Sequence, residues 1–305
     1  MSEPTTTSSV PTPVTNSVPG TFINTTVKPF DPSQPHQTPA MVAFDQSLAK
    51  FRSNPKFVVG NITTIAVSPF GSLGNAKAGF GYVHADVTYS KINNPTTGAP
   101  VTVPGLALVR GSSVTILTFL HCEGIDYVIL TEQARLPIGD PVYKEAPAGM
   151  QDGDENFIGV AANEMCQEVG LKKLGPTDFK YLCEFVPSAG GCDERIKVLF
   201  LRVKCDKTVL AYLNGHLTGA IEENEQITVR ILPLSEVRSQ IRSGILTDAK
   251  LMVGLLHYLE SPELHKWSCD RHLVMGEDGK PHMVIPTVAP NVSWFATVWN
   301  WMFSS

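Results

Sequence analysis

The sequence lacks the features of several specialised protein classes. No apolar run approaches the roughly 18 residues that a membrane-spanning helix needs, and the six cysteines form no C-x-x-C pair. We therefore expect no membrane span, no zinc site and no disulfide framework, but free thiols in a reducing compartment. The net charge of −5 gives no basic surface of the kind that binds nucleic acid.

The first 40 residues contain few charged or large apolar side chains. Eight prolines, nine threonines and five serines occur among them, with only three charged residues. Such a segment cannot bury enough apolar surface to fold alone, so residues 1–40 are predicted to form a disordered tail, either a plain linker or a regulatory or targeting arm. They show neither the apolar stretch of a signal peptide nor the Arg-rich pattern of a transit peptide, and we expect a cytoplasmic protein.

Residues 41–105 are rich in strand-forming patterns. A short helical pattern near Phe44 is followed by strand-like runs at 57–67 and 79–89 and by a turn at 93–98. We expect a small β-rich segment here, ahead of a larger domain.

The central region, residues 106–260, alternates apolar runs with one amphipathic helical pattern. This order predicts a mixed α/β/α sandwich. A second helical pattern, at 248–258, has apolar residues at core-packing spacing. Residues 261–305 are expected to be a C-terminal extension. Its tryptophans (Trp294, Trp299 and Trp301) would pack on the protein itself or on a partner subunit, or contact a membrane surface.

The window from Gly149 to Leu171 contains the residues most suggestive of chemistry. If residues 157–169 form a helix, Glu164 and Glu168 lie four residues apart on one face and repel each other by a few tenths of a kcal/mol. A divalent cation bound by oxygen ligands would more than offset this repulsion. Two glutamates on a solvated helix face are the alternative for an isolated pair.

This window resembles the signature of the Nudix hydrolase family, G-x5-E-x7-R-E-U-x-E-E-x-G-U, where U is aliphatic. The matching residues are Gly149, Glu155, Glu164, Met165, Glu168, Gly170 and Leu171. Two positions depart from the signature: Asn163 replaces the arginine, and Gln167 replaces the first glutamate of the E-E pair.

Further segments resemble the branch of the family that splits ADP-sugars and ADP-ribose. The resemblance covers about residues 105–260. The plant-type ADP-sugar pyrophosphatases are among the proteins that the chain resembles. The similar segments are LTEQAR at 130–135, EAPAG at 145–149, PSAGGCDE at 187–194 and EENEQITV at 222–229.

The resemblance implies an enzyme of the α/β class, a Nudix α/β/α sandwich with a mixed sheet, that hydrolyses the pyrophosphate bond of an ADP-sugar or ADP-ribose. It implies Mg²⁺ or Mn²⁺ as cofactor and a homodimer assembled partly through residues 41–105. The alternatives are a catalytically impaired protein that binds nucleotide sugars, and a hydrolase of another nucleotide compound.

The resemblance also assigns roles to individual residues. The metal ligands would be the Ala148 carbonyl, Glu164, Gln167 and Glu168, and the base that deprotonates the attacking water would be Glu223 or Glu225. Substrate contacts are implied for Arg110, Arg135, Met150 and Glu194, with Arg110 reaching across a dimer interface.

Overall fold

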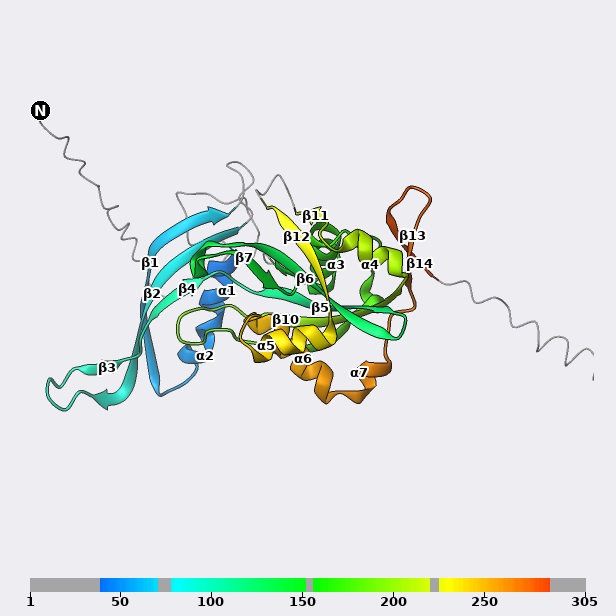
Figure 1. Cartoon of the computed structure of the whole chain (residues 1–305). Coiled ribbons are helices and arrows are strands. Elements are labelled where there is room, and N and C mark those ends of the chain that lie inside the picture. The colour runs from blue at the N-terminus through cyan, green and yellow to red at the C-terminus, as the bar shows by residue number, and fades with distance from the viewer. Residues whose placement is uncertain (1–38, 71–77, 152–155, 220–224, 286–305) are drawn as a thin grey trace, which may run out of the picture.

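A computed structural model describes residues 39–70, 78–151, 156–219 and 225–285. The segment predicted as a disordered tail, except for Pro39 and Ala40, and the tryptophans at 294, 299 and 301 lie outside these residues. Figure 1 shows two sheets with helices packed against them. The helices are α1 (Pro39–Ser47), α2 (Ala49–Arg52), α3 (Phe157–Glu168), α4 (Lys207–Leu213), α5 (Leu234–Arg242), α6 (Ala249–Glu260) and α7 (Pro262–Lys266), with short 3₁₀ turns η2 (Leu136–Ile138) and η3 (Pro176–Asp178).

The first sheet is formed by β1 to β4 of the N-terminal region. Its strands are β1 (Phe57–Phe70), β2 (Ala78–Asn93), β3 (Pro100–Thr102) and β4 (Leu106–Val109). Strand β2 pairs antiparallel with each of the other three strands. Helix α1 packs on this sheet through buried Met41 and Phe44, and Leu48, between α1 and α2, is buried in the same cluster. The β-rich N-terminal segment expected from the sequence is therefore present.

The larger sheet carries the rest of the fold, and its strands run in the order β11-β12-β6-β5-β10-β13-β14. Three further strands extend it: β7 pairs with β6, β8 with β5 and β9 with β10. The strands are β5 (Ser113–Cys122), β6 (Ile125–Arg135), β7 (Asp140–Glu145), β8 (Ala148–Met150), β9 (Lys180–Phe185), β10 (Ile196–Cys205), β11 (Leu217–Thr218), β12 (Ile227–Pro233), β13 (His272–Met275) and β14 (Pro281–Val284). Strands β5 and β10 are parallel, whereas β5 and β6 are antiparallel, so the sheet is mixed as predicted.

Apolar residues are buried on both faces of the large sheet. Successive residues of a strand point to opposite sides, so one strand contributes to both clusters. On β5, Ile116 and Leu120 join the apolar cluster that includes Met165 of α3. Leu117 and Phe119 join the opposite cluster, which includes helices α5 and α6. The result is the predicted α/β/α sandwich (Figure 1). No helix within the described ranges is long and apolar enough to cross a membrane.

The structure differs from the expected division of the chain at two points. Strand β4, which we placed at the start of the central domain, belongs to the first sheet because it pairs with β2. Strands β13 and β14, which we placed in a C-terminal extension, continue the large sheet because β13 pairs with β10. Strands of four residues are too short to show a periodicity that assigns them to a sheet.

Candidate active site

Helix α3 holds the two predicted acidic ligands at the edge of the large sheet. Its first turn is capped by Asn156, whose side chain accepts a hydrogen bond from Gly159 N across 3.1 Å. It ends before Gly170, which has a φ of 82° and so stops the helix, as the sequence indicated. Burial of Ala161 and Met165 against β5 fixes the helix rotation. Glu164 and Glu168 are thereby directed toward β8.

Glu168 is bonded directly to the strand that precedes the helix. Its Oε2 accepts a hydrogen bond from the backbone N–H of Ala148 across 3.1 Å. The carbonyl of the preceding residue, Pro147, accepts instead from Ile116 N of β5. Because backbone groups of successive strand residues point to opposite sides, the polar groups of Ala148 face α3. The residue predicted to supply the carbonyl ligand is therefore the one whose N–H bonds to Glu168.

Glu164 lies against the next residue of the same strand. A Cβ built on Gly149 would overlap the carboxylate of Glu164. Only glycine leaves space for that carboxylate at this position, which gives a physical reason for the glycine that opens the signature. The carboxylates of Glu164 and Glu168, one helical turn apart, thus both lie against strand β8.

The electrostatics of this site favour a bound cation. Glu168 is only 4% exposed, and burial, followed by the repulsion from Glu164, raises its pKa well above the usual range. Glu145 and Glu225 contribute to the same upward shift, while the hydrogen bond from Ala148 opposes it. A cation near these carboxylates would relieve the repulsion and favour their ionised form.

The acidic loop predicted to carry the base begins beside the end of α3. Gly219 N donates to the Gln167 carbonyl at 3.2 Å, and Thr218 Oγ1 donates to the Glu168 carbonyl at 2.5 Å. Glu225, at the other end of this loop, lies close enough to influence the pKa of Glu168. Glu223, the other candidate base, lies outside the described residues.

A second cluster contains three of the four predicted substrate-binding residues. Arg110 follows β4 and contacts both Met150 Sδ, at 3.2 Å, and Glu194 Oε2, at 3.5 Å. Ser113 Oγ donates to Glu194 Oε1 at 2.9 Å, which orients that carboxylate. Asp193 Oδ1 accepts from Arg110 N at 2.8 Å and ties the first sheet to the loop before β10. Burial raises the pKa of Asp193, and its backbone hydrogen bonds, including that from Arg110, oppose the rise.

The fourth predicted substrate residue, Arg135, contacts a different partner. Its Nε donates to Glu145 Oε1 at 2.5 Å, and its contact with substrate stays a prediction. Glu145 is nearly buried and lies three residues before Ala148. Arg135 is therefore joined, through Glu145, to the segment that leads into β8.

Comparison with known proteins identifies the family. No protein-family model matches the chain. The chain is 37% identical over 163 residues to Nudix hydrolase 14, chloroplastic, of Arabidopsis thaliana, a match that covers 50% of this chain and 50% of that protein. It is 31% identical over 153 residues to the GDP-mannose pyrophosphatase of Pectobacterium atrosepticum, covering 48% of this chain and 72% of that protein. The chain belongs to the Nudix hydrolase family.

The chain spans about half the length of the first of these Nudix relatives. A solved structure described as an ADP compounds hydrolase has a TM-score of 0.43 and 16% sequence identity, covering 65% of this chain and 92% of that chain.

The two departures from the Nudix signature lie together on the outer side of α3. Asn163 and Gln167 are both exposed and are four residues apart, so they are neighbours on the helix. Glu164 and Glu168, one position further along, face β8. The side chain of Gln167, predicted as a metal ligand, thus occupies a more exposed face than the two glutamates.

The donor set fits a hard divalent cation. Such ions take oxygen ligands from carboxylates, carbonyls and amides, and Glu164, Glu168, Gln167 and the Ala148 carbonyl supply these types. Within the part of the chain that the structure describes, no three His, Cys, Asp or Glu side chains are grouped to hold a metal ion.

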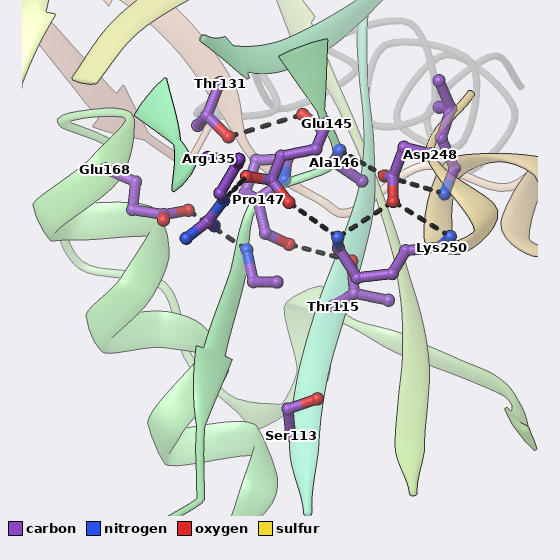
Figure 2. Close-up of polar contacts among 12 residues, drawn as sticks. Ser113, Thr115, Thr131, Arg135, Glu145, Ala146, Pro147, Glu168, Asp248 and Lys250 are labelled. Carbon is purple, nitrogen blue, oxygen red and sulfur yellow. Dashed lines mark hydrogen bonds and ion pairs between the residues drawn. The ribbon is translucent and has the colours of Figure 1, made fainter. Parts of the chain in front are cut away.

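Sequence reasoning missed the residues that support this strand from the other side. Figure 2 shows Glu145 between Arg135 and Lys250, with Asp248 beside Lys250. We interpreted residues 248–258 as a core-packing helix, and Leu251, Gly254 and Tyr258 of α6 are indeed buried. An aspartate before an apolar run is typical of an ordinary helix start, so the pattern contained no signal for the contact of Lys250 with Glu145.

Proposed function

We propose that the protein hydrolyses the pyrophosphate bond of a nucleoside diphosphate sugar, an ADP-sugar or ADP-ribose, to AMP and a sugar phosphate, with Mg²⁺ or Mn²⁺ as cofactor. The convergence of Glu164, Glu168 and the Ala148 backbone at one strand edge carries this proposal. The family membership and the segments similar to the ADP-sugar branch support it.

The substrate resists hydrolysis because its phosphate oxygens are anionic and repel a nucleophile. A divalent cation, when bound, would neutralise part of this charge and lower the pKa of a bound water. Glu164, Glu168 and the Ala148 carbonyl would hold it, with the Gln167 amide oxygen as a further donor.

The chain's own residues would then position the substrate and move the proton. Glu225, or Glu223 in the same loop, accepts a proton from the attacking water, whose oxygen forms the new bond to phosphorus. The bond from that phosphorus to the bridging oxygen breaks, and the bridging oxygen leaves with the other phosphate. Arg110, which contacts Met150 and Glu194, supplies a positive charge for binding the substrate. Arg135 is the remaining residue predicted to contact the substrate.

A nucleotide-sugar-binding module is the second candidate, because Asn163 and Gln167 replace charged residues of the signature. Loss of one preorganised electrostatic group typically lowers a rate by about 10²–10³. Such a protein would bind the substrate without releasing AMP.

A panel of nucleoside diphosphate compounds separates these functions. We expect AMP and a sugar phosphate from ADP-glucose or ADP-ribose with Mg²⁺ or Mn²⁺, and no product with a chelator. Turnover that persists in chelator would refute the metal assignment. Binding of ADP-sugar without turnover on any compound would favour the binding module.

A further inference from the structure

Lys250 forms a buried ion-pair network with two carboxylates next to the candidate metal site. Its Nζ lies 2.7 Å from Glu145 Oε2 and 2.9 Å from Asp248 Oδ1. The side chains of Lys250, Glu145 and Asp248 are 15%, 5% and 4% exposed. Burial of a lysine charge is costly, and the cost is offset only when the paired carboxylates are held in a favourable geometry.

The network connects helix α6 to the strand that carries the Ala148 carbonyl. Asp248 caps α6, and its Oδ2 also accepts from Ala146 N at 2.9 Å. Lys250 holds the side chain of Glu145, so α6 binds two consecutive residues of the segment that leads into β8. This attachment is visible in Figure 2.

The opposite side of the same segment is held by β5. Thr115 Oγ1 donates to the Pro147 carbonyl at 3.0 Å, and Ile116 N donates to the same oxygen at 2.9 Å. Residues 145–147 are thereby fixed by α6 and by β5. The next residue, Ala148, is the one whose backbone faces Glu168.

The charge of Lys250 also links this network to the glutamate pair. Burial alone would lower the pKa of Lys250, but Asp248 and Glu145 outweigh it and raise that pKa, so Lys250 is charged at neutral pH. Glu145 lies close enough to Glu168 to repel it. Without Lys250, a second buried negative charge would be less well neutralised beside the metal-binding pair.

We propose that Lys250 is a positioning residue for the divalent-cation site, acting through Glu145 and Asp248 on the strand that carries the Ala148 carbonyl. The inference rests on the proposed function, since it needs a cation at Glu164 and Glu168. Lys250 would act through these two carboxylates, to which its Nζ donates.

Direct measurement of Mn²⁺ binding tests this role independently of turnover. Free Mn²⁺ would be measured by electron paramagnetic resonance during titration of the full chain, for wild type and Lys250→Met. Residues that orient metal ligands typically alter affinity by about 10–100-fold when removed. We expect Lys250→Met to raise the Kd for Mn²⁺ by at least about tenfold.

Arg202 provides a matched control for general destabilisation. Its side chain is 12% exposed and pairs with Asp126 through bonds of 2.9 and 3.1 Å. It lies on β10 opposite Phe119 of β5, four residues along β5 from Thr115, which pairs with Ala148. Arg202→Met should lower the Tm, as Lys250→Met does, but leave the Kd for Mn²⁺ within about twofold of wild type.

Equal Kd values for Lys250→Met and wild type would overturn the positioning role, as would equal weakening by Arg202→Met. In either case wild-type metal binding and turnover would leave the proposed function standing. Absence of Mn²⁺ binding by the wild type would overturn both. If Lys250→Met does not fold, Lys250→Arg decides: a guanidinium keeps the charge but changes the geometry, and we expect a Kd raised about threefold, whereas an unchanged Kd would contradict the role.

Discussion

The carboxylate of Glu168 and the backbone N–H of Ala148 form a hydrogen bond of 3.1 Å between helix α3 and strand β8. The bond places a nearly buried glutamate beside a second glutamate, Glu164, at the point where the Nudix signature predicts a metal. Without a cation this arrangement is unfavourable, because burial and like charge both disfavour ionisation of Glu168. The ionised form of Glu168 therefore destabilises the fold, although it is the form that would bind a cation.

The first prediction concerns the stability cost of Glu168. In chelator at pH 8, Glu168→Gln should raise the Tm by about 2–5 °C, because the amide removes a buried like-charge repulsion. The pKa of Glu168 is raised in the folded state. The stability that its protonated form contributes is therefore fully present below the ordinary pKa and is lost as the pH rises through the raised value. The difference in Tm between variant and wild type should thus grow from pH 5 to pH 8. A variant that melts below wild type at pH 8 in chelator would show that the carboxylate stabilises the fold.

The second prediction uses the close approach of Gly149 to Glu164. Gly149→Ala should reduce turnover by about 10² or more, because the added methyl group must displace the Glu164 carboxylate. Gly175→Ala is the control, since its added Cβ would meet other atoms at 3.8 Å, an ordinary contact distance. Steady-state kinetics at saturating metal would measure both. Equal activity of the two variants would mean that Glu164 is not needed at its observed place.

The third prediction addresses the two departures from the signature. Asn163→Arg combined with Gln167→Glu restores one cation and one carboxylate without changing net charge, and both positions are exposed, so the Tm should change little. If the site is a weakened hydrolase, turnover should rise about tenfold, which corresponds to ~1.4 kcal/mol of barrier. A wild type that is already fast and is slowed by the double change would show that Asn163 and Gln167 belong to a different metal arrangement.

The fourth prediction is a homodimer formed partly through the first sheet. This sheet exposes large apolar side chains, among them Val58, Tyr82, Ile92 and Leu106 at 51–58% exposure, and a partner subunit would cover such a surface. Light scattering at micromolar concentration should give twice the chain mass, and Tyr82→Glu with Leu106→Glu should give the monomer mass. A wild-type monomer with full activity would refute both the dimer and a role for Arg110 across its interface.

Much of the catalytic face of the fold could be predicted from the sequence. Helix α3 was expected at 157–169 and is observed at Phe157–Glu168, because its apolar residues recur at helical spacing. Strand β5 (Ser113–Cys122) is one of the apolar runs expected within residues 106–260. The spacing of four residues also predicted that Glu164 and Glu168 share one face of this helix.

The contacts between distant segments could not be predicted in the same way. Lys250 and Glu145 are separated by 105 residues, and no local pattern records which helix start packs against which strand end. The bond between Arg135 and Glu145 also lacks a local signal, because the register of β6 and β7 places Glu145 opposite Thr131 and Arg135 opposite Asp140. Short strands such as β4 and β13 depend on pairing with a distant strand and show too few residues for a periodic signal.

The measurement that tests the central claim most directly is AMP release from ADP-glucose and ADP-ribose during a Mg²⁺ titration of wild type and Glu164→Gln. The account predicts that wild type releases AMP and sugar phosphate in equal amounts, with a rate that rises with Mg²⁺ and falls to background in chelator. Glu164→Gln should remain folded and release no AMP above background at any Mg²⁺ concentration. Wild-type AMP release that is independent of Mg²⁺, or undiminished release by Glu164→Gln, would contradict the account.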